Sequence, residues 1–309
     1  MQKPKIIVIL GQTATGKSDL AVQIAKKFKG AVISADSRQV YKGLDIGSGK
    51  ITKKEMRGVK HHCLSYASPK KIHTISEFKK CAERAIYVIA RRKLVPIICG
   101  GTGLYIDVLL NNIELPVVKP NPKLRANLEK LNVNTLFKRL YKLDSKRAET
   151  LKNNGGYKNK RRLIRALEII DSTKKPIDYF GDGDFNNNLS ESPYDILYIG
   201  IKIPDNKLKK RIRDRLLKRV KNGLIKEVKD LHYETKIKWK TLYNLGLEYR
   251  YVSLYLQKLI TKEELLSQLE NKIWQYAKRQ KTWFKRNSKI NWIKNKNEAV
   301  SLVKVFLKQ

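Results

Sequence analysis

A glycine-containing stretch at residues 11–18, GQTATGKS, most constrains what this chain can fold into. It fits the phosphate-loop pattern G-x-x-x-x-G-K-[ST] at every fixed position. The apolar run before it, residues 5–10, predicts a buried strand, and the amphipathic residues 17–28 predict a helix after it. A strand, a glycine turn and a helix in this order place backbone N–H groups around an anion. The sequence therefore predicts a phosphorylated ligand, with Lys17 near its terminal phosphates and the Ser18 hydroxyl able to ligate Mg²⁺.

The composition sets broad limits on the class of protein. With 309 residues, the chain is long enough for two domains or for one domain carrying an insertion. No apolar run approaches the length of a membrane span, and no signal peptide is visible, so we expect a cytoplasmic protein without a membrane partner. Cys63, Cys81 and Cys99 are widely spaced and form no C-x-x-C pair, which predicts reduced thiols.

The net charge of +39, from 67 Lys and Arg against 28 Asp and Glu, is extreme. Such a charge attracts polyanions. Residues 160–165 are basic, and residues 274–286 interleave cations with aromatic rings. Each run alone is typical of a solvated helix face, and a bias toward Lys and Asn in the source is an alternative cause of the charge. Together these features favour an RNA partner.

The first third of the chain alternates strands and helices. Residues 31–35 predict a strand that ends at Asp36, and residues 95–99 predict another that enters the glycine turn at 100–103. Between them, the T-x-x-E pattern at residues 74–77 predicts a capping box ahead of a helix. This alternation predicts a parallel α/β sheet.

The character of the chain changes at Pro116, Pro120 and Pro122. Residues 123–177 read as helical, basic and leucine-rich, residues 180–192 as a loop and residues 194–203 as a strand, with helices from there to the C-terminus. The prediction is an α/β fold, a P-loop parallel sheet core with a helical insertion domain. The core would comprise residues 1–118 and 191–309, and the insertion residues 119–190.

Polar residues follow two of the predicted strands. Ligands of open parallel sheets bind outside the carboxyl ends of the strands, so Asp36 should face the phosphate loop, where it could ligate Mg²⁺ or accept a proton. A structural cap is the alternative. Thr102 lies in the second glycine turn, which offers further donors for a diphosphate or is simply a tight turn. His61 and His62 have no partner at metal-ligand spacing, and we expect no zinc.

Several segments occur in the order found in bacterial tRNA dimethylallyltransferases, and the chain resembles this family over residues 6–286. The segments are GQTATGKS, DSRQVYKGLDIGSGK, HH, GGTGLY, RRLIRALEI, NGLIKEV and YAKRQKTWF. The resemblance implies transfer of a dimethylallyl group from dimethylallyl diphosphate to N6 of adenosine 37 of tRNA. It implies a monomer that uses Mg²⁺ at Ser18 and grips the anticodon stem-loop with the insertion domain.

The resemblance also implies roles for individual residues. Asp36 corresponds to the general base, and Thr102, Lys17 and Arg215 to groups at the diphosphate. The diphosphate-binding residues would be Gly11, Thr13, Ala14, Thr15, Gly16, Lys17 and Ser18. The tRNA-binding residues would be Asp36, Ser37, Arg38, Gln39, Lys123, Lys160, Arg161, Arg162, Leu163, Ile164, Arg279 and Arg286.

The chain departs from the family pattern at three places. Ser48-Gly49 replaces Thr-Ala, Lys158-Asn159 replaces Asn-Asp, and Ile273-Trp274 replaces Thr-Arg, which removes a cation.

Three other functions fit parts of the sequence. A small-molecule kinase using ATP would need a helical lid with paired arginines, which the sequence does not show after the sheet. An enzyme acting on free adenine nucleotides would not need the large basic C-terminal half. A non-enzymatic RNA-binding module would leave Asp36 and Thr102 without a catalytic use.

Overall fold

The computed structural model describes residues 3–111, 113, 115–116, 118–153, 155–177 and 192–309. The chain divides into two compact units, a larger one of residues 1–112 and 192–309 and a smaller one of residues 113–191. The smaller unit thus begins at residue 113, six residues before the boundary at residue 119 that the prolines predict. The loop expected at residues 180–192 falls, except for Ser192, outside the described residues.

The larger unit is built on a parallel sheet, as the sequence predicts. Its strands, in spatial order, are β3 (His61–His62), β2 (Gly30–Ala35), β4 (Val95–Gly100), β1 (Lys5–Leu10), β5 (Asp195–Ile201) and β6 (Ile290–Ile293). Each neighbouring pair is parallel. Leu10 pairs with Gly100 on one side and with Gly200 on the other. The strand that follows the smaller unit therefore lies beside the first strand of the chain.

Two strands were not predicted. The sequence predicts only helices after β5, yet β6 closes one edge of the sheet, and the two-residue β3 closes the other. In β6, Ile290 and Ile293 are buried while the two residues between them are exposed. Elements this short carry too little periodicity to be recognised, and their partners in the sheet define them.

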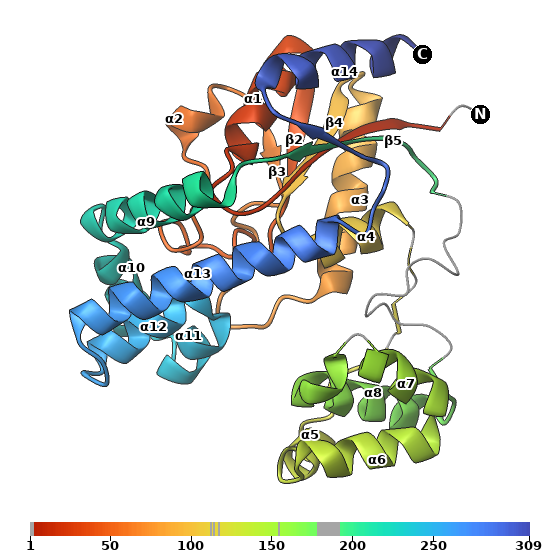
Figure 1. The fold of residues 1–309 in the computed structure, drawn as a ribbon, viewed down its shortest axis with the longest axis vertical. Coiled ribbons are helices and arrows are strands. Elements are labelled where there is room, and N and C mark those ends of the chain that lie inside the picture. Colours follow the sequence, from red (N-terminus) through yellow and green to blue (C-terminus); the bar gives the residue numbers. More distant parts are fainter. Residues whose placement is uncertain (1–2, 112, 114, 117, 154, 178–191) are drawn as a thin grey trace. The chain divides into compact units, whose positions relative to one another are not determined.

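Helices cover both faces of the sheet, as Figure 1 shows. The helices α1 (Lys17–Lys27) and α14 (Lys296–Lys308) pack on Ile7 and Ile9, whereas α3 (Ile75–Arg91) and α4 (Gly103–Leu110) pack on Ile6 and Val8. Alternate residues of a strand point to opposite faces, which explains the uninterrupted apolar run of β1. The predicted capping box at Thr74 is confirmed, since its hydroxyl accepts from the Glu77 N–H at 3.2 Å.

The rest of the larger unit is helical. A second apolar cluster is formed by buried residues of this part, among them Leu216, Val228, Tyr249 and Leu265. The longest of these helices is α13 (Lys262–Phe284), which lies below the strands in the view of Figure 1. The elements are α2 (Lys53–Met56), α9 (Asp205–Lys221), α10 (Leu224–Tyr233), α11 (Trp239–Leu245), α12 (Leu247–Leu256) and α13 (Lys262–Phe284).

The smaller unit is helical and has its own core. It contains α5 (Pro122–Glu129), α6 (Val133–Leu143), α7 (Ser145–Asn153), a 3₁₀ turn (Gly156–Lys158) and α8 (Lys160–Thr173). The Glu168 side chain is buried in this unit and accepts hydrogen bonds from Arg125, Arg165 and the Asn121 N–H. Burial by itself raises the pKa of this carboxyl, but the hydrogen bonds outweigh it and lower the pKa to about 2. Glu168 is therefore ionised at neutral pH, and its carboxylate joins Asn121, Arg125 and Arg165 within the unit.

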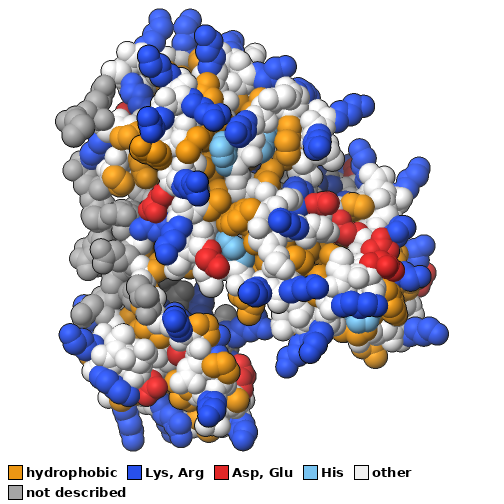
Figure 2. All heavy atoms as spheres, turned by 180° about the vertical axis from the view of Figure 1, so that it is seen from behind, with side chains coloured by type: hydrophobic (Ala, Val, Ile, Leu, Met, Phe, Trp, Pro, Cys, Tyr) orange, Lys and Arg blue, Asp and Glu red, His pale blue; other side chains and the backbone are white. Residues whose placement is uncertain are grey.

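The surface carries the excess of cations. Figure 2 shows Lys and Arg side chains over much of the visible face, with few acidic side chains between them. In the part of the chain that the structure describes, no helix is both long and apolar enough to span a bilayer.

Candidate functional site

The phosphate loop joins β1 to α1. Gly16 precedes α1 with a φ of 93°, in the left-handed region that favours glycine, and it is exposed. The Lys17 ammonium folds back over the loop and donates to the Gln12 carbonyl at 2.6 Å. Burial is the main cause that lowers the pKa of Lys17, to about 8. An anion bound in the loop would therefore offset the cost of burying this charge.

The second glycine turn joins β4 to α4. A Cβ at Gly100 would lie 2.1 Å from the Ala35 carbonyl oxygen, so only glycine lets β4 approach β2 this closely. Thr102 donates its N–H to the same carbonyl at 3.2 Å. Its hydroxyl accepts from the Ser37 N–H at 3.2 Å. The ends of β2 and β4 are thus joined.

Asp36 follows β2 and uses one carboxylate oxygen to shape the chain. Its Oδ1 accepts from the N–H groups of Arg38 and Gln39, at 2.8 and 3.3 Å. Within the described residues, no donor is hydrogen-bonded to Oδ2. The structure thus contains the local turn that a structural role requires, and it also leaves one oxygen for a ligand.

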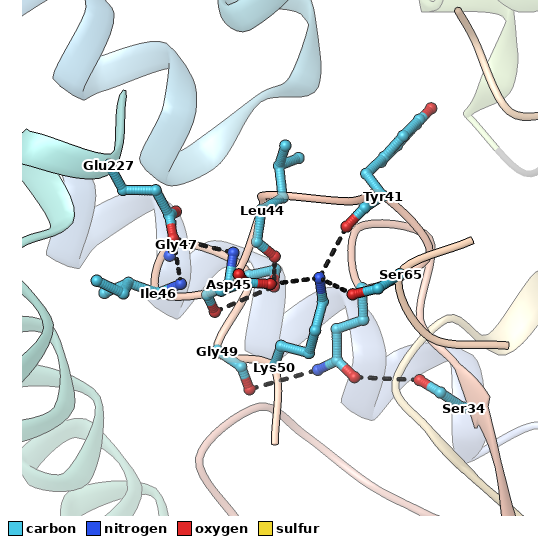
Figure 3. A network of polar contacts seen from close by, with 12 residues as sticks. Ser34, Tyr41, Leu44, Asp45, Ile46, Gly47, Gly49, Lys50, Ser65 and Glu227 are labelled. Carbon is cyan, nitrogen blue, oxygen red and sulfur yellow. Dashed lines mark hydrogen bonds and ion pairs between the residues drawn. The ribbon is translucent and has the colours of Figure 1, made fainter. Parts of the chain in front are cut away.

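The segment after Asp36 is held by Lys50, whose side chain is 8% exposed. In Figure 3 its ammonium lies between Tyr41, Asp45 and Ser65, and it donates to all three, to a carbonyl, a carboxylate and a hydroxyl at 2.7, 2.6 and 2.7 Å. Gln39 adds a further contact by donating to the Gly49 carbonyl at 3.4 Å. These contacts fold residues 36–50 into one compact loop.

Glu227 of α10 holds the same loop from the other side, as Figure 3 shows. Its carboxylate accepts from the N–H groups of Asp45, Ile46 and Gly47 at 2.9, 2.6 and 3.0 Å. The Tyr249 hydroxyl also donates to it, at 3.1 Å. Successive N–H groups converging on a carboxylate form an anion-binding nest, here filled by the protein itself.

Two arginines of α9 contact the carbonyls of this loop. Arg215 donates to the Gly49 carbonyl at 3.2 Å, and Arg219 donates to the Gly47 carbonyl at 3.2 Å and to Glu248 at 2.6 Å. A Cβ at Gly49 would lie 1.8 Å from Arg219 Nη2 and 2.5 Å from Arg215 Nη2. The glycine that departs from the family pattern therefore provides the room these guanidinium groups occupy.

Two cavities meet at Asp36. One, of about 480 Å³, lies between the phosphate loop and α9 and is lined by Lys17, Ser18 and Arg215. The other, of about 370 Å³, is lined by cations of three segments: Arg38, Arg250, Lys272 and Arg279. Both are lined by Thr13, Asp36, Ser48, Arg219 and Tyr276. The first cavity can hold an anion beside the phosphate loop, and the second can hold a polyanion on the other side of Asp36.

Most of the predicted residues of the larger unit gather here. The first cavity takes in Ala14, Gly16 and Gln39 as well, and Ser37 lines the second. Gly11 and Thr15 are buried and shape the loop, where the Thr15 hydroxyl donates to the Gln12 carbonyl at 2.8 Å. Arg286 lines neither cavity, and its guanidinium lies 4.0 Å from the Trp283 ring centroid.

The predicted tRNA-binding residues of the smaller unit differ in exposure. Lys123 and Arg161 are exposed, Arg162 is half-buried, and Lys160 donates to the Glu129 carbonyl. Leu163 and Ile164 lie in the core of the unit, at 0% and 3% exposed. The expectation needs correction for these two side chains, because helical periodicity turns them inward and away from solvent.

Four further residues line or support the site. No role was predicted from the sequence for Arg219, Glu227, Tyr276 or Gln280. Gln280 accepts from the Thr13 N–H at 2.7 Å and donates to the Gly101 carbonyl at 2.8 Å. The motif YAKRQ contains Tyr276 and Gln280, and NGLIKEV contains Glu227, whereas no motif signalled Arg219. The partners of all four residues lie far away in sequence.

The cysteines are free thiols, and His61 contacts the backbone. Cys63 and Cys81, far apart in sequence, are free thiols with Sγ atoms 2.8 Å apart, and Cys99 is a buried free thiol. His61 contacts the Val59 carbonyl through Nδ1 at 2.9 Å. Among the described residues, no three His, Cys, Asp or Glu side chains gather as metal ligands.

Comparison with known proteins gives a consistent family. The model of a family described as IPP transferase matches residues 39–287. The tRNA dimethylallyltransferase 2 of Treponema denticola is 41% identical over 298 residues, which cover 94% of this chain and 96% of that protein. The tRNA dimethylallyltransferase of Carboxydothermus hydrogenoformans is 36% identical and covers 97% of this chain and 94% of its own.

Solved structures agree. The tRNA isopentenylpyrophosphate transferase of Bacillus halodurans is 32% identical, covers 99% of both chains and superposes with a TM-score of 0.71. A eukaryotic dimethylallyltransferase, captured acting on tRNA, is 29% identical with a TM-score of 0.74 and covers 91% of this chain and 69% of its own. The chain therefore belongs to the IPP transferase family.

Proposed function

We propose that the protein transfers a dimethylallyl group from dimethylallyl diphosphate to N6 of adenosine 37 of tRNA, releasing diphosphate. The observation that carries the proposal is the position of Asp36, whose Oδ2 is without a hydrogen bond among the described residues at the junction of the two cavities. The names of the relatives, tRNA dimethylallyltransferases from several bacteria, support the same reaction.

The first cavity would stabilise the leaving group. As the bond from the allylic carbon to oxygen breaks, negative charge accumulates on the diphosphate. Lys17 and Arg215 line the cavity and bring positive charge to it. Fixed charges directed at the place where charge develops contribute much of enzymatic rate acceleration. The Gly49 carbonyl, which accepts from Arg215, would hold the guanidinium in place.

Asp36 would act on the nucleophile. The lone pair of an exocyclic adenine nitrogen is delocalised into the ring, so the amine attacks poorly unless its proton is removed as the new C–N bond forms. Oδ2 of Asp36 would accept that proton, while Oδ1 keeps the turn closed through Arg38 and Gln39. The base must leave the anticodon stack to reach this atom.

The second cavity would receive the RNA. Its cationic lining, Arg38, Arg250, Lys272 and Arg279, suits the phosphates beside an extruded nucleotide. The smaller unit would bind the anticodon stem-loop through exposed cations such as Lys123 and Arg161. We propose further that the enzyme acts as a monomer in the cytoplasm.

Mg²⁺ fits the first cavity. This ion needs one or two protein oxygens and takes its other ligands from water and phosphate. The Ser18 hydroxyl is exposed at the start of α1, and the Asp36 carboxylate lines the same cavity. Ser18 would hold the ion, which when bound would supply additional positive charge to the diphosphate.

The test separates this reaction from ATP-dependent phosphorylation, the alternative left by the phosphate loop. The protein would be incubated with ¹⁴C-dimethylallyl diphosphate or with γ-³²P-ATP, each with a tRNA carrying A37, with the same tRNA carrying G37, and without RNA. We expect ¹⁴C in the A37 tRNA alone. Transfer of ³²P to a small molecule, with no ¹⁴C in RNA, would refute the proposal.

A further inference from the structure

One donor of the phosphate loop is already occupied within the protein. The Thr13 N–H donates to the Gln280 side-chain carbonyl at 2.7 Å. Backbone N–H groups are the means by which a phosphate loop holds its ligand. The occupied N–H is therefore removed from the set available to phosphate oxygens, and the Gln280 amide takes the place of an anion there.

Gln280 is firmly placed between the two glycine turns. It is 5% exposed, and its Nε2 donates to the Gly101 carbonyl at 2.8 Å. A Cβ at Gly101 would lie 2.2 Å from that nitrogen, so the second turn accepts the amide only with glycine at this position. One turn of α13 away, the Ala277 carbonyl accepts from Gln12 Nε2 at 3.1 Å. The helix is thus fixed to both sides of the phosphate loop.

The position of Gln280 affects how many phosphates a ligand in the first cavity can carry. Gln280 and Tyr276 line the first cavity beside Thr13. A diphosphate ester with an apolar tail needs donors for two phosphates only. A third phosphate would bring further charged oxygens, which require donors and space that the Gln280 amide already occupies, and unpaired desolvated charge is costly.

We propose that Gln280 makes this phosphate loop selective for a diphosphate over a triphosphate. The inference rests on the proposed function for the identity of the substrate. It also gives a structural reason why a loop pattern shared with ATP-binding proteins would serve a ligand with two phosphates.

The test measures binding directly and does not depend on turnover. Isothermal titration would give the dissociation constants of inorganic pyrophosphate and inorganic tripolyphosphate for the full-length protein, Gln280→Ala and Gln280→Asn. Gln275→Ala is the matched control, because Gln275 is an exposed residue of the same helix. Thermal melting would check that each variant folds.

We expect the ratio of tripolyphosphate to pyrophosphate dissociation constants to fall about tenfold or more in Gln280→Ala, the effect of one hydrogen bond to a charged group. Gln275→Ala should keep the wild-type ratio. A wild-type ratio in a folded Gln280 variant would overturn the proposal, as would loss of pyrophosphate binding in both variants, which would make Gln280 a support of the loop only. A changed ratio in a protein that does not prenylate tRNA would refute the proposed function alone.

Discussion

The Thr102 hydroxyl accepts a hydrogen bond from the Ser37 N–H at 3.2 Å, which ties the second glycine turn to the residue directly after Asp36. The group proposed to take the proton and the turn proposed to face the leaving diphosphate are therefore parts of one hydrogen-bonded unit. A displacement of either strand end would disturb both halves of the reaction.

Asp36→Asn should separate the two functions of this carboxylate. The asparagine carbonyl can keep the hydrogen bonds from Arg38 and Gln39, whereas its amide cannot accept a proton. We expect the single-turnover rate at saturating tRNA to fall by about 10²–10⁴ with little change in tRNA affinity. Asp195→Asn, an exposed carboxylate at the start of β5, is the control and should prenylate at close to the wild-type rate. A rate for Asp36→Asn within a few-fold of wild type would remove Asp36 from the chemistry.

Glu227→Ala should lower both the stability and the substrate affinity of the enzyme, although Glu227 lines neither cavity. The substitution leaves the N–H groups of Asp45, Ile46 and Gly47 without their shared acceptor, at a cost of about 1–3 kcal/mol in the free energy of unfolding. Because Arg215 is held by the same loop, the KM for dimethylallyl diphosphate should rise. Urea denaturation and initial-rate kinetics would measure the two effects. Glu234→Ala, exposed after the same helix, should change neither; equal effects would argue against the nest.

Lys17→Met should raise the thermal stability of the protein and lower its activity. The folded-state pKa of Lys17, about 8, lies below its ordinary value of 10.5, so burial of the charge disfavours folding at neutral pH. The wild-type protein should gain stability as the pH rises from 8 to 10.5, where the unfolded chain binds more protons. The variant should melt about 2–4 °C higher at pH 7 and lose about 10²–10³ in kcat.

Lys17 should also make ligand binding depend on pH. Pyrophosphate needs the ammonium form, so its affinity for the wild-type protein should decrease as the pH rises through about 8, and this step should be missing in Lys17→Met. Titration calorimetry between pH 6 and 10 would measure both proteins. The same step in the variant would assign the titration to another group.

Glu168→Gln should destabilise the smaller unit. The low pKa of this carboxyl means that its contribution is complete above about pH 4.5 and is lost as the pH falls toward 2. We expect a loss of about 1–3 kcal/mol at pH 7, read as faster hydrogen exchange of α8 amides. Glu149→Gln, exposed in the same unit, should leave exchange unchanged. Equal protection in both variants would show that the buried ion pairs contribute nothing.

The affinity for tRNA should depend steeply on salt. Six to ten phosphate contacts cost about 10³–10⁵ in affinity between 50 and 200 mM salt. Arg279→Ala should reduce the slope of log K against log salt by about one, whereas Lys308→Ala, on the distant α14, should not. Fluorescence anisotropy would measure the slopes. A salt-independent affinity would leave compositional bias as the explanation of the +39 charge.

Local patterns predicted the parts of this molecule whose partners are near in sequence. The strand at β1, the phosphate loop and the capping box at Thr74 each follow from short-range rules and agree with the structure. The position of Asp36 beside the loop follows from the rule for the carboxyl ends of strands. Such features depend on few residues and one geometry.

The remaining features depend on long-range pairing. Gln280 meets Thr13 across 267 residues, and Glu227 meets Gly47 across 180, so no window of sequence contains both partners. Cys63 and Cys81 contact each other although their spacing fits no motif. For Leu163 and Ile164, the family resemblance implies contact with tRNA, whereas helical periodicity predicts the burial that the structure shows.

The pairing of β5 with β1 has a consequence for synthesis on the ribosome. Residues 5–10 cannot meet their partners at 195–200 until the intervening chain, with the whole smaller unit, has been made. That unit is held by helices close in sequence, whose short-range contacts form quickly. The smaller unit can therefore fold while the sheet of the larger unit still lacks its inner strand β5. One edge of β1 stays unpaired until β5, which is translated about 190 residues later, has been made.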